Sequence, residues 1–205
     1  GIRDVAPSRG LGDVYKRQFL LAALFCACIS YAQIRVQERL PKSKTGFALT
    51  TAKTRAKIYY DVNDALVIKR SAELFARDIQ MVTGQKPELI QKRERAKALV
   101  IVGTIEKNQW ICELAQKGKI DIRPLQGAWE RYLIQTVDNP SPGVAKALVI
   151  AGSDRRGAAY GLFSISEMMG VSPWYWWGDV PVKTHKALYV CLLYTSPSPR
   201  DGATS

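Results

Sequence analysis

The chain has 205 residues, with 30 Lys and Arg against 18 Asp and Glu, and 47% of its residues are hydrophobic. This length suits one ordinary α/β domain, or two small ones, but is too short for a (β/α)8 barrel of about 250 residues with anything attached. The fifteen glycines and ten prolines are ordinary numbers, which excludes a fibrous or largely disordered chain. The net charge of +12 suggests an anionic partner.

The two ends of the chain are complementary at the level of DNA. Codons for residues 8–18 (SRGLGDVYKRQ) can be chosen so that their reverse complement, shifted by one base, encodes residues 191–201 (CLLYTSPSPRD). The relation extends outward, and the DNA resembles a sequencing adapter read through on both sides of a short insert. Residues 1–18 and 191–205 are therefore predicted to be adapter-derived and not native. Without their five basic and three acidic residues, the net charge is still about +10.

The remaining insert opens with FLLAALFCACISYAQ, an apolar run that ends in Ser30, Tyr31 and Ala32. Small residues at positions 30 and 32 are typical of a signal-peptide cleavage site. Residues 19–32 are thus predicted to be a truncated signal peptide cut near Ala32, with a buried core helix as the alternative. The run is shorter than the roughly 20 residues of a membrane span, so no stable membrane insertion is expected. The mature protein is expected to be exported, to the periplasm or outside the cell.

Cysteine and histidine usage limits the available chemistry. Cys26 and Cys28 would leave with the signal and Cys191 belongs to a predicted adapter tail, so Cys112 alone remains. One cysteine forms no internal disulfide, and with the single His185 it supplies too few ligands for a metal site. We expect no metal and no cofactor.

The domain proper is predicted over residues 46–182, after a polar linker at 33–45. Short β-branched and aromatic runs predict strands at 47–52, 57–62, 89–90, 98–104, 130–137 and 147–154. Residues 138–143 are turn-rich. Apolar spacings of three and four predict helices after Asn63 and Asp64, at 107–117 and from residue 155. Asn63 and Asp64 are expected to cap the first of these helices. Strands that alternate with helices indicate an α/β fold, a single layered domain with a mixed sheet flanked by helices.

A glycine-rich turn, Gly152–Gly157 (GSDRRG), follows the last strand and opens the last helix. It lacks the Lys-Ser/Thr of a phosphate-binding loop and the glycine spacing of a dinucleotide site. One interpretation is a structural turn in which Asp154 caps the helix. The other is contact of Arg155 or Arg156 with an anion or a sugar.

Four consecutive aromatic residues, Trp174-Tyr175-Trp176-Trp177, exceed what one strand face can bury. They suit carbohydrate stacking, with Asp179 nearby to bind hydroxyl groups, and they equally suit packing against a neighbouring domain. The basic residues elsewhere are not interleaved with aromatic ones, so nucleic acid is not an expected partner. Solvated faces or attraction to an acidic polysaccharide explain them better.

Residues 152–182, GSDRRGAAYGLFSISEMMGVSPWYWWGDVPV, resemble the end of the N-terminal domain of glycoside hydrolase family 115, the xylan α-glucuronidases. ELFARDIQMVTGQKP (73–87) and ALVIVGT (98–104) fit the same domain. The resemblance implies an inverting enzyme that removes glucuronic acid or its 4-O-methyl form from xylan. In this family an α/β domain precedes a (β/α)8 barrel that holds the general acid and base.

The resemblance also implies what the chain lacks and what it binds. Residues 183–190 would begin the connection to a catalytic barrel that is missing here, so no residue is predicted to be catalytic. The expected partners are that barrel, within the parent polypeptide, and glucuronoxylan or a related acidic polysaccharide. Predicted substrate-binding residues, at the uronate end of the cleft, are Asp154, Arg156, Trp176, Trp177 and Asp179.

Two alternatives remain open. One is the N-terminal α/β domain of another glycoside hydrolase, hexosaminidase-like or from another α-glucuronidase family. The other is a non-catalytic carbohydrate-binding module. The sequence downstream of residue 190 would distinguish them, because only an enzyme needs a barrel with an acid pair.

Overall fold

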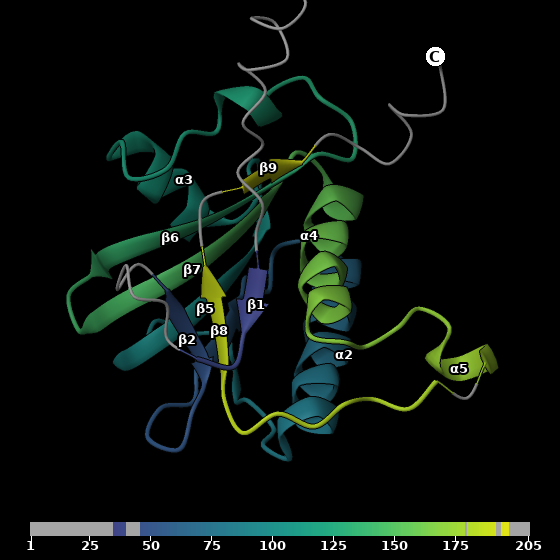
Figure 1. Ribbon diagram of the computed structural model, residues 1–205. Helices are drawn as coiled ribbons and strands as arrows, with labels where there is room; N and C mark the ends of the chain where they lie inside the picture. Colours follow the sequence, from purple (N-terminus) through teal and green to yellow (C-terminus); the bar gives the residue numbers. More distant parts are fainter. Residues whose placement is uncertain (1–34, 40–45, 179, 192–193, 197–205) are drawn as a thin grey trace, which may run out of the picture. The chain divides into compact units, whose positions relative to one another are not determined.

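The computed structural model describes residues 35–39, 46–178, 180–191 and 194–196 (Figure 1). Predictions for residues 1–18 and 19–32 lie outside the described residues.

The main sheet has six strands in the order β4-β3-β5-β7-β6-β9. The first four are parallel, and β6 and β9 are antiparallel to their neighbours, so the predicted mixed sheet is confirmed. The strands are β3 (Lys57–Tyr60), β4 (Leu89–Ile90), β5 (Ala96–Thr104), β6 (Tyr132–Ser141), β7 (Val144–Gly152) and β9 (Tyr194–Ser196).

Helices cover both faces of this sheet (Figure 1). The helices α2 (Leu66–Thr83) and α4 (Arg155–Met168) lie on one face, and α3 (Gln109–Gln116) lies on the other. Because successive residues of a strand point to opposite faces, Val100 and Val102 of β5 pack with α2 and α4, whereas Leu99 and Ile101 pack with α3. The near-continuous apolar run at 98–104 is therefore buried on both sides, as its composition predicted.

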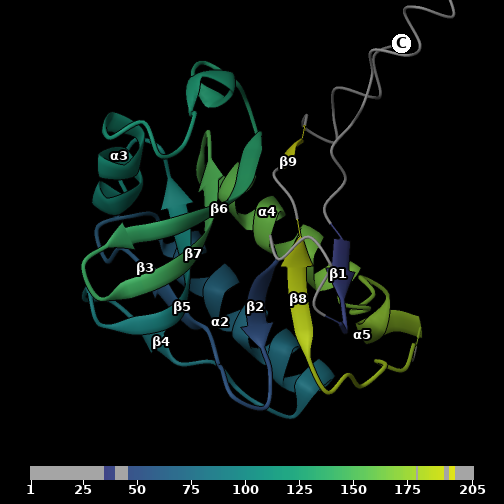
Figure 2. The same ribbon diagram turned by 60° about the vertical axis from the view of Figure 1, so that its left-hand side comes forward.

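A second, three-stranded antiparallel sheet was not predicted (Figure 2). It has the order β1-β8-β2, with β1 (Arg35–Gln37), β2 (Phe47–Thr50) and β8 (Leu188–Cys191). Its apolar side chains Phe47, Leu49, Leu188 and Val190 are buried in the same core cluster as α2 and α4. The predicted strand at 47–52 therefore exists, but it lies outside the main sheet.

The predicted boundary between residues 190 and 191 falls within β8, and three residues beyond it form β9. Edge strands offer backbone donors and acceptors to any extended segment, whatever its sequence. The short pairing of β9 with β6 thus gives no information on the origin of residues 191–205, which stays a prediction.

Two local predictions were wrong. Asn63 and Asp64 do not cap α2: the N-cap is Ala65, without a side-chain bond, because the Asp64 carboxylate accepts from the backbone N–H of Thr104 at 2.8 Å. That contact links the carboxyl ends of β3 and β5. The turn predicted at 138–143 is also shorter than expected, since β6 continues to Ser141 and β7 begins at Val144.

Asn108 holds the start of α3. Its Oδ1 accepts from the backbone N–H groups of Trp110 and Ile111, both at 3.1 Å, and its Nδ2 donates to the Val102 carbonyl at 3.0 Å. The side chain is fully buried, so every one of these bonds is shielded from water. Asn108 therefore joins α3 to β5.

We predict that Asn108→Ala lowers the free energy of unfolding by about 1–3 kcal/mol, because it removes the cap and leaves a buried carbonyl unpaired. Chemical denaturation followed by circular dichroism measures this. Asn63→Ala, at an exposed asparagine, is the matched control and should stay within about 0.5 kcal/mol of wild type. Equal effects of the two substitutions would contradict the role of Asn108.

Candidate functional site

The predicted glycine-rich turn lies where β7 ends and α4 begins. Asp154 is the N-cap of α4, and its Oδ1 accepts from the backbone N–H groups of Arg156 and Gly157, both at 2.8 Å. Its Oδ2 accepts from the backbone N–H of Glu130 at 2.7 Å. The capping role that the sequence offered for Asp154 is thus observed, and the same carboxylate also holds the segment before β6. A role of Asp154 in binding substrate stays a prediction.

The glycines of this turn are required by close backbone contacts. A Cβ atom at Gly157 would lie 2.2 Å from the Arg131 carbonyl oxygen, and one at Gly152 would lie 2.1 Å from the backbone nitrogen of Ala158. The backbone N–H of Ser153 donates to the same Arg131 carbonyl at 2.9 Å. We call the contact of residues 129–131 with residues 152–157 the β6–β7 corner.

Arg156 is anchored at this corner by a buried carboxylate. Its Nη1 lies 2.9 Å from Oε1 of Glu130, whose side chain is 3% exposed, while the Arg156 side chain is 53% exposed. The hydrogen bond to Glu130 raises the pKa of Arg156, which therefore stays charged. Glu130 itself has a φ of 55°, in the left-handed region that non-glycine residues seldom adopt. Arg156 is thus held in position, with part of its guanidinium open to solvent.

The corner also carries an exposed tryptophan that the sequence analysis did not single out. Trp129 is 79% exposed and directly precedes Glu130. Its only sequence signal is a lone aromatic residue in the polar stretch before a strand. Arg155, next to Arg156, is exposed and forms no ion pair or hydrogen bond with any residue that the structure describes. The exposed Trp129 ring and the exposed Arg155 guanidinium, both at this corner, are groups of the kind that bind a sugar acid.

The predicted site residues do not all lie together. Arg156 is in the first turn of α4, whereas Trp177 is in the short helix α5 (Tyr175–Gly178), beyond the other end of α4 (Figure 1). A helix of 14 residues is about 21 Å long, so one sugar unit does not bridge them. Trp177 and Trp174 are 86% and 68% exposed. The side chain of Trp176, and the whole of Asp179, lie outside the described residues.

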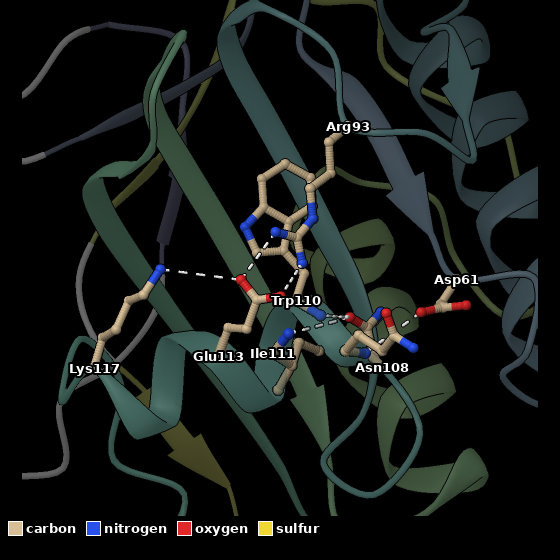
Figure 3. A network of polar contacts seen from close by, with 8 residues as sticks. Asp61, Arg93, Asn108, Trp110, Ile111, Glu113 and Lys117 are labelled. Carbon is tan, nitrogen blue, oxygen red and sulfur yellow. Dashed lines mark hydrogen bonds and ion pairs between the residues drawn. The ribbon is translucent and has the colours of Figure 1, made fainter.

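The carboxyl ends of β3 and β5, where open α/β sheets often bind ligands, are filled by the protein's own polar groups. A Cβ atom at Gly103 would lie 2.4 Å from Nδ2 of Asn108 and 2.8 Å from Oδ2 of Asp64. Nearby, Oδ2 of Asp61 lies 3.4 Å from the backbone nitrogen of Gln109 (Figure 3). This network positions α3 and fills the space directly beside Gly103.

An ion pair on the outer side of α3 completes this network (Figure 3). Both Glu113 oxygens accept from Arg93, at 2.5 and 2.9 Å, which lowers the pKa of Glu113 and raises that of Arg93. The Arg93 guanidinium also lies 4.9 Å from the centre of the Trp110 ring. Arg93 thus contacts two residues of α3, Trp110 and Glu113, and stabilises the position of that helix.

A cavity of about 530 Å³ opens between α2, α4 and the segment that leads to α5. It contains Asp78, which is 6% exposed. Burial raises the pKa of the Asp78 carboxyl, and the Ser166 hydroxyl and the Arg77 charge oppose part of that rise. The exposed apolar side chains Leu74 and Phe163 line the same cavity. This mixed, hollow face suits packing against further protein.

Among the described residues, no helix is long and apolar enough to cross a membrane. No group of three or more His, Cys, Asp or Glu side chains in that part of the chain could hold a metal ion.

We predict that Arg156→Ala lowers the free energy of unfolding, because it leaves the buried Glu130 carboxylate without its guanidinium. In the double variant with Glu130→Gln, the loss should be smaller than the sum of the two single losses. Arg155→Ala, one residue away, is the control and should change stability by less than about 0.5 kcal/mol. Strictly additive losses would show that Arg156 and Glu130 are not coupled.

A second prediction concerns pH and Asp78. Because its pKa in the folded protein is raised above the ordinary 3.8, the contribution of Asp78 to stability should fall as pH rises from there through the raised pKa, and then level off. Asp78→Asn does not titrate, so its stability relative to wild type should increase between pH 3 and pH 7. Arg123 lowers the pKa of Asp121 to about 2. The stability of Asp121→Asn relative to wild type should therefore decrease as pH rises through the same range. Parallel stability curves for wild type and Asp78→Asn would refute the burial effect.

No protein-family model matches the chain, and no curated protein matches it. Among solved structures, the chain is similar to the family GH115 4-O-methyl-α-glucuronidase BtGH115A, which has specificity for decorated arabinogalactans. The two are 30% identical with a TM-score of 0.55, over 69% of this chain. The chain spans 17% of that protein's length.

Two further structures match at lower identity. CpGH84D is 10% identical over 80% of this chain and 23% of its own, with a TM-score of 0.47. The GH20 β-N-acetylhexosaminidase from Streptomyces coelicolor A3(2) is 13% identical over 83% of this chain and 26% of its own, with a TM-score of 0.40. Neither similarity carries an inference about function. The chain thus resembles a domain-sized part of a glycoside hydrolase.

Proposed function

We propose that residues 46–182 are the N-terminal accessory domain of an exported, inverting α-glucuronidase. The parent enzyme would remove glucuronic acid or 4-O-methylglucuronic acid from the side chains of a polysaccharide. The observation that carries this proposal is the similarity to BtGH115A, at 30% identity over 69% of the chain. Both enzymes would act on a glucuronic acid side chain. The polymer that bears it is xylan for the proposed parent enzyme and decorated arabinogalactan for BtGH115A.

The proposed domain supports catalysis without performing it. Inverting hydrolysis needs two carboxyl groups about 6.5–9.5 Å apart with a water molecule between them. The carboxylates of the β6–β7 corner are engaged otherwise: Asp154 caps α4 and Glu130 holds Arg156. The acid and the base would therefore come from a catalytic barrel in the parent polypeptide, and the 205-residue chain alone is expected to be inactive.

Two exposed surfaces would meet the rest of such an enzyme. Trp174 and Trp177 are mostly exposed, and the cavity between α2 and α4 opens beside the segment that carries them. Exposed tryptophans bury large areas when another domain covers them. At the β6–β7 corner, Arg156 presents a charged group that could bind or brace a sugar carboxylate.

A non-catalytic carbohydrate-binding module is the second candidate. The specific observation in its favour is the exposure of three tryptophans, Trp129, Trp174 and Trp177, whose rings could stack on sugars. In that case the same side chains would contact polysaccharide directly, and no catalytic barrel would be required.

The test is an activity measurement on the parent protein, expressed from the full gene. We predict release of glucuronic or 4-O-methylglucuronic acid from glucuronoxylan, with the product initially in the β configuration by NMR. Arg156→Ala in that protein should raise KM more than it lowers kcat, and Arg155→Ala is the matched control. Absence of uronic acid release from both glucuronoxylan and arabinogalactan would refute the proposed activity, and lowered stability with unchanged KM would assign Arg156 to packing.

A further inference from the structure

A basic groove lies at the amino-terminal edge of the main sheet, where β5 and β7 begin. We define it by the cations Arg95, Lys97, Lys117 and Lys119 together with residues 139–145, the tip of the β6–β7 hairpin. The hollow between them has a volume of about 740 Å³. Asp154 and Arg156 follow the carboxyl end of β7, so the basic groove is at the opposite edge of the sheet.

The positive charge of the basic groove is not neutralised from within. No Asp or Glu lines it, and in the part of the chain that the structure describes the side chains of Arg95 and Lys97 have no ion-pair or hydrogen-bond partner. Among the described residues, Lys119 Nζ donates to a backbone carbonyl, that of Asn139, and to no carboxylate. Four cations around one hollow attract an anion.

Carboxylates close to the groove residues in the chain, or within ion-pair distance of one of them, are already engaged: Glu94 pairs with Lys57 and Asp121 with Arg123. Glu113 lies 4.0 Å from Lys117, but both of its oxygens accept from Arg93. Asp138 lies 3.5 Å from Lys146, which is not one of the four cations. The excess positive charge therefore remains available to a ligand.

The hairpin tip at residues 139–145 forms one wall of the basic groove and has a constrained backbone. Gly143 has a φ of 88° and Asn139 has a φ of 48°, and the rings of Pro140 and Pro142 fix their own φ angles. A Cβ atom at Gly143 would lie 2.9 Å from Cγ of Arg95, so the arginine stem lies directly against the turn. The wall is thus shaped before any ligand binds.

The lining favours one class of ligand. It contains no aromatic residue, so the bases of a single-stranded nucleic acid would find no ring to stack on. Carboxylates on a flexible sugar chain need only cations and hydrogen-bond donors, which the groove provides. We propose that the basic groove binds the uronate carboxylates of an acidic polysaccharide, holding the polymer on this domain. The choice of polysaccharide over other polyanions rests on the proposed function.

Affinity gel electrophoresis of the 205-residue chain tests this inference. Mobility is measured in gels that contain glucuronoxylan, carboxyl-reduced glucuronoxylan as a neutral version of the same polymer, or polyuridylate RNA. The test variant is Lys97→Gln/Lys119→Gln. Its control is Lys69→Gln/Lys107→Gln, which removes the same charge at the other edge of the sheet, where α2 and α3 begin.

We expect the wild type to be retarded by glucuronoxylan and not by the reduced polymer. The groove variant should bind at least about fivefold more weakly at low salt, and the control variant should bind within about twofold of wild type. Retardation by the neutral polymer, equal loss in both variants, or stronger retention by the RNA would overturn the inference. If the parent enzyme releases no uronic acid but the groove variant alone loses glucuronoxylan binding, the proposed activity fails and the basic groove stands.

Discussion

The carboxylate of Asp154 binds three backbone N–H groups from two distant parts of the chain, and the arrangement of the β6–β7 corner depends on it. It fixes the first turn of α4 through Arg156 and Gly157, and it fixes the start of β6 through Glu130. These contacts require the glycines that let the backbones approach within hydrogen-bond distance. Once they are made, the Glu130 carboxylate is buried and needs a cation, which Arg156 supplies.

The two edges of the main sheet differ in how their polar side chains are used. At the carboxyl edge of the parallel strands, polar side chains form hydrogen bonds within the domain. Asp64 and Asn108 join neighbouring elements, and Asp154 holds the β6–β7 corner. At the amino edge, the basic residues have few protein partners and surround a hollow. One edge therefore stabilises the fold, whereas the other is available for a polyanion.

Local patterns predicted the elements of the fold well. The apolar runs of β5 and β7 and the spacing of α2 each have one way to be buried, so their positions followed from the sequence. Contacts between distant residues could not be predicted in the same way. The partner of Asp64 is 40 residues away, that of Arg156 is 26 residues away, and β1 pairs with β8 across most of the domain. For the same reason the capping role of Asp154 was accessible from the sequence, whereas Glu130, Trp129 and the separation of Arg156 from Trp177 were not.

The most direct test of the central proposal is to sequence the source DNA across the codon for Val190 with an unrelated library chemistry. The proposal predicts that CLLYTSPSPRDGATS is replaced by a long coding continuation with βα repeats and carboxylates at strand ends. Recovery of the same fifteen-residue tail followed by a stop codon would contradict it, because the chain would then be a small protein with no barrel to support.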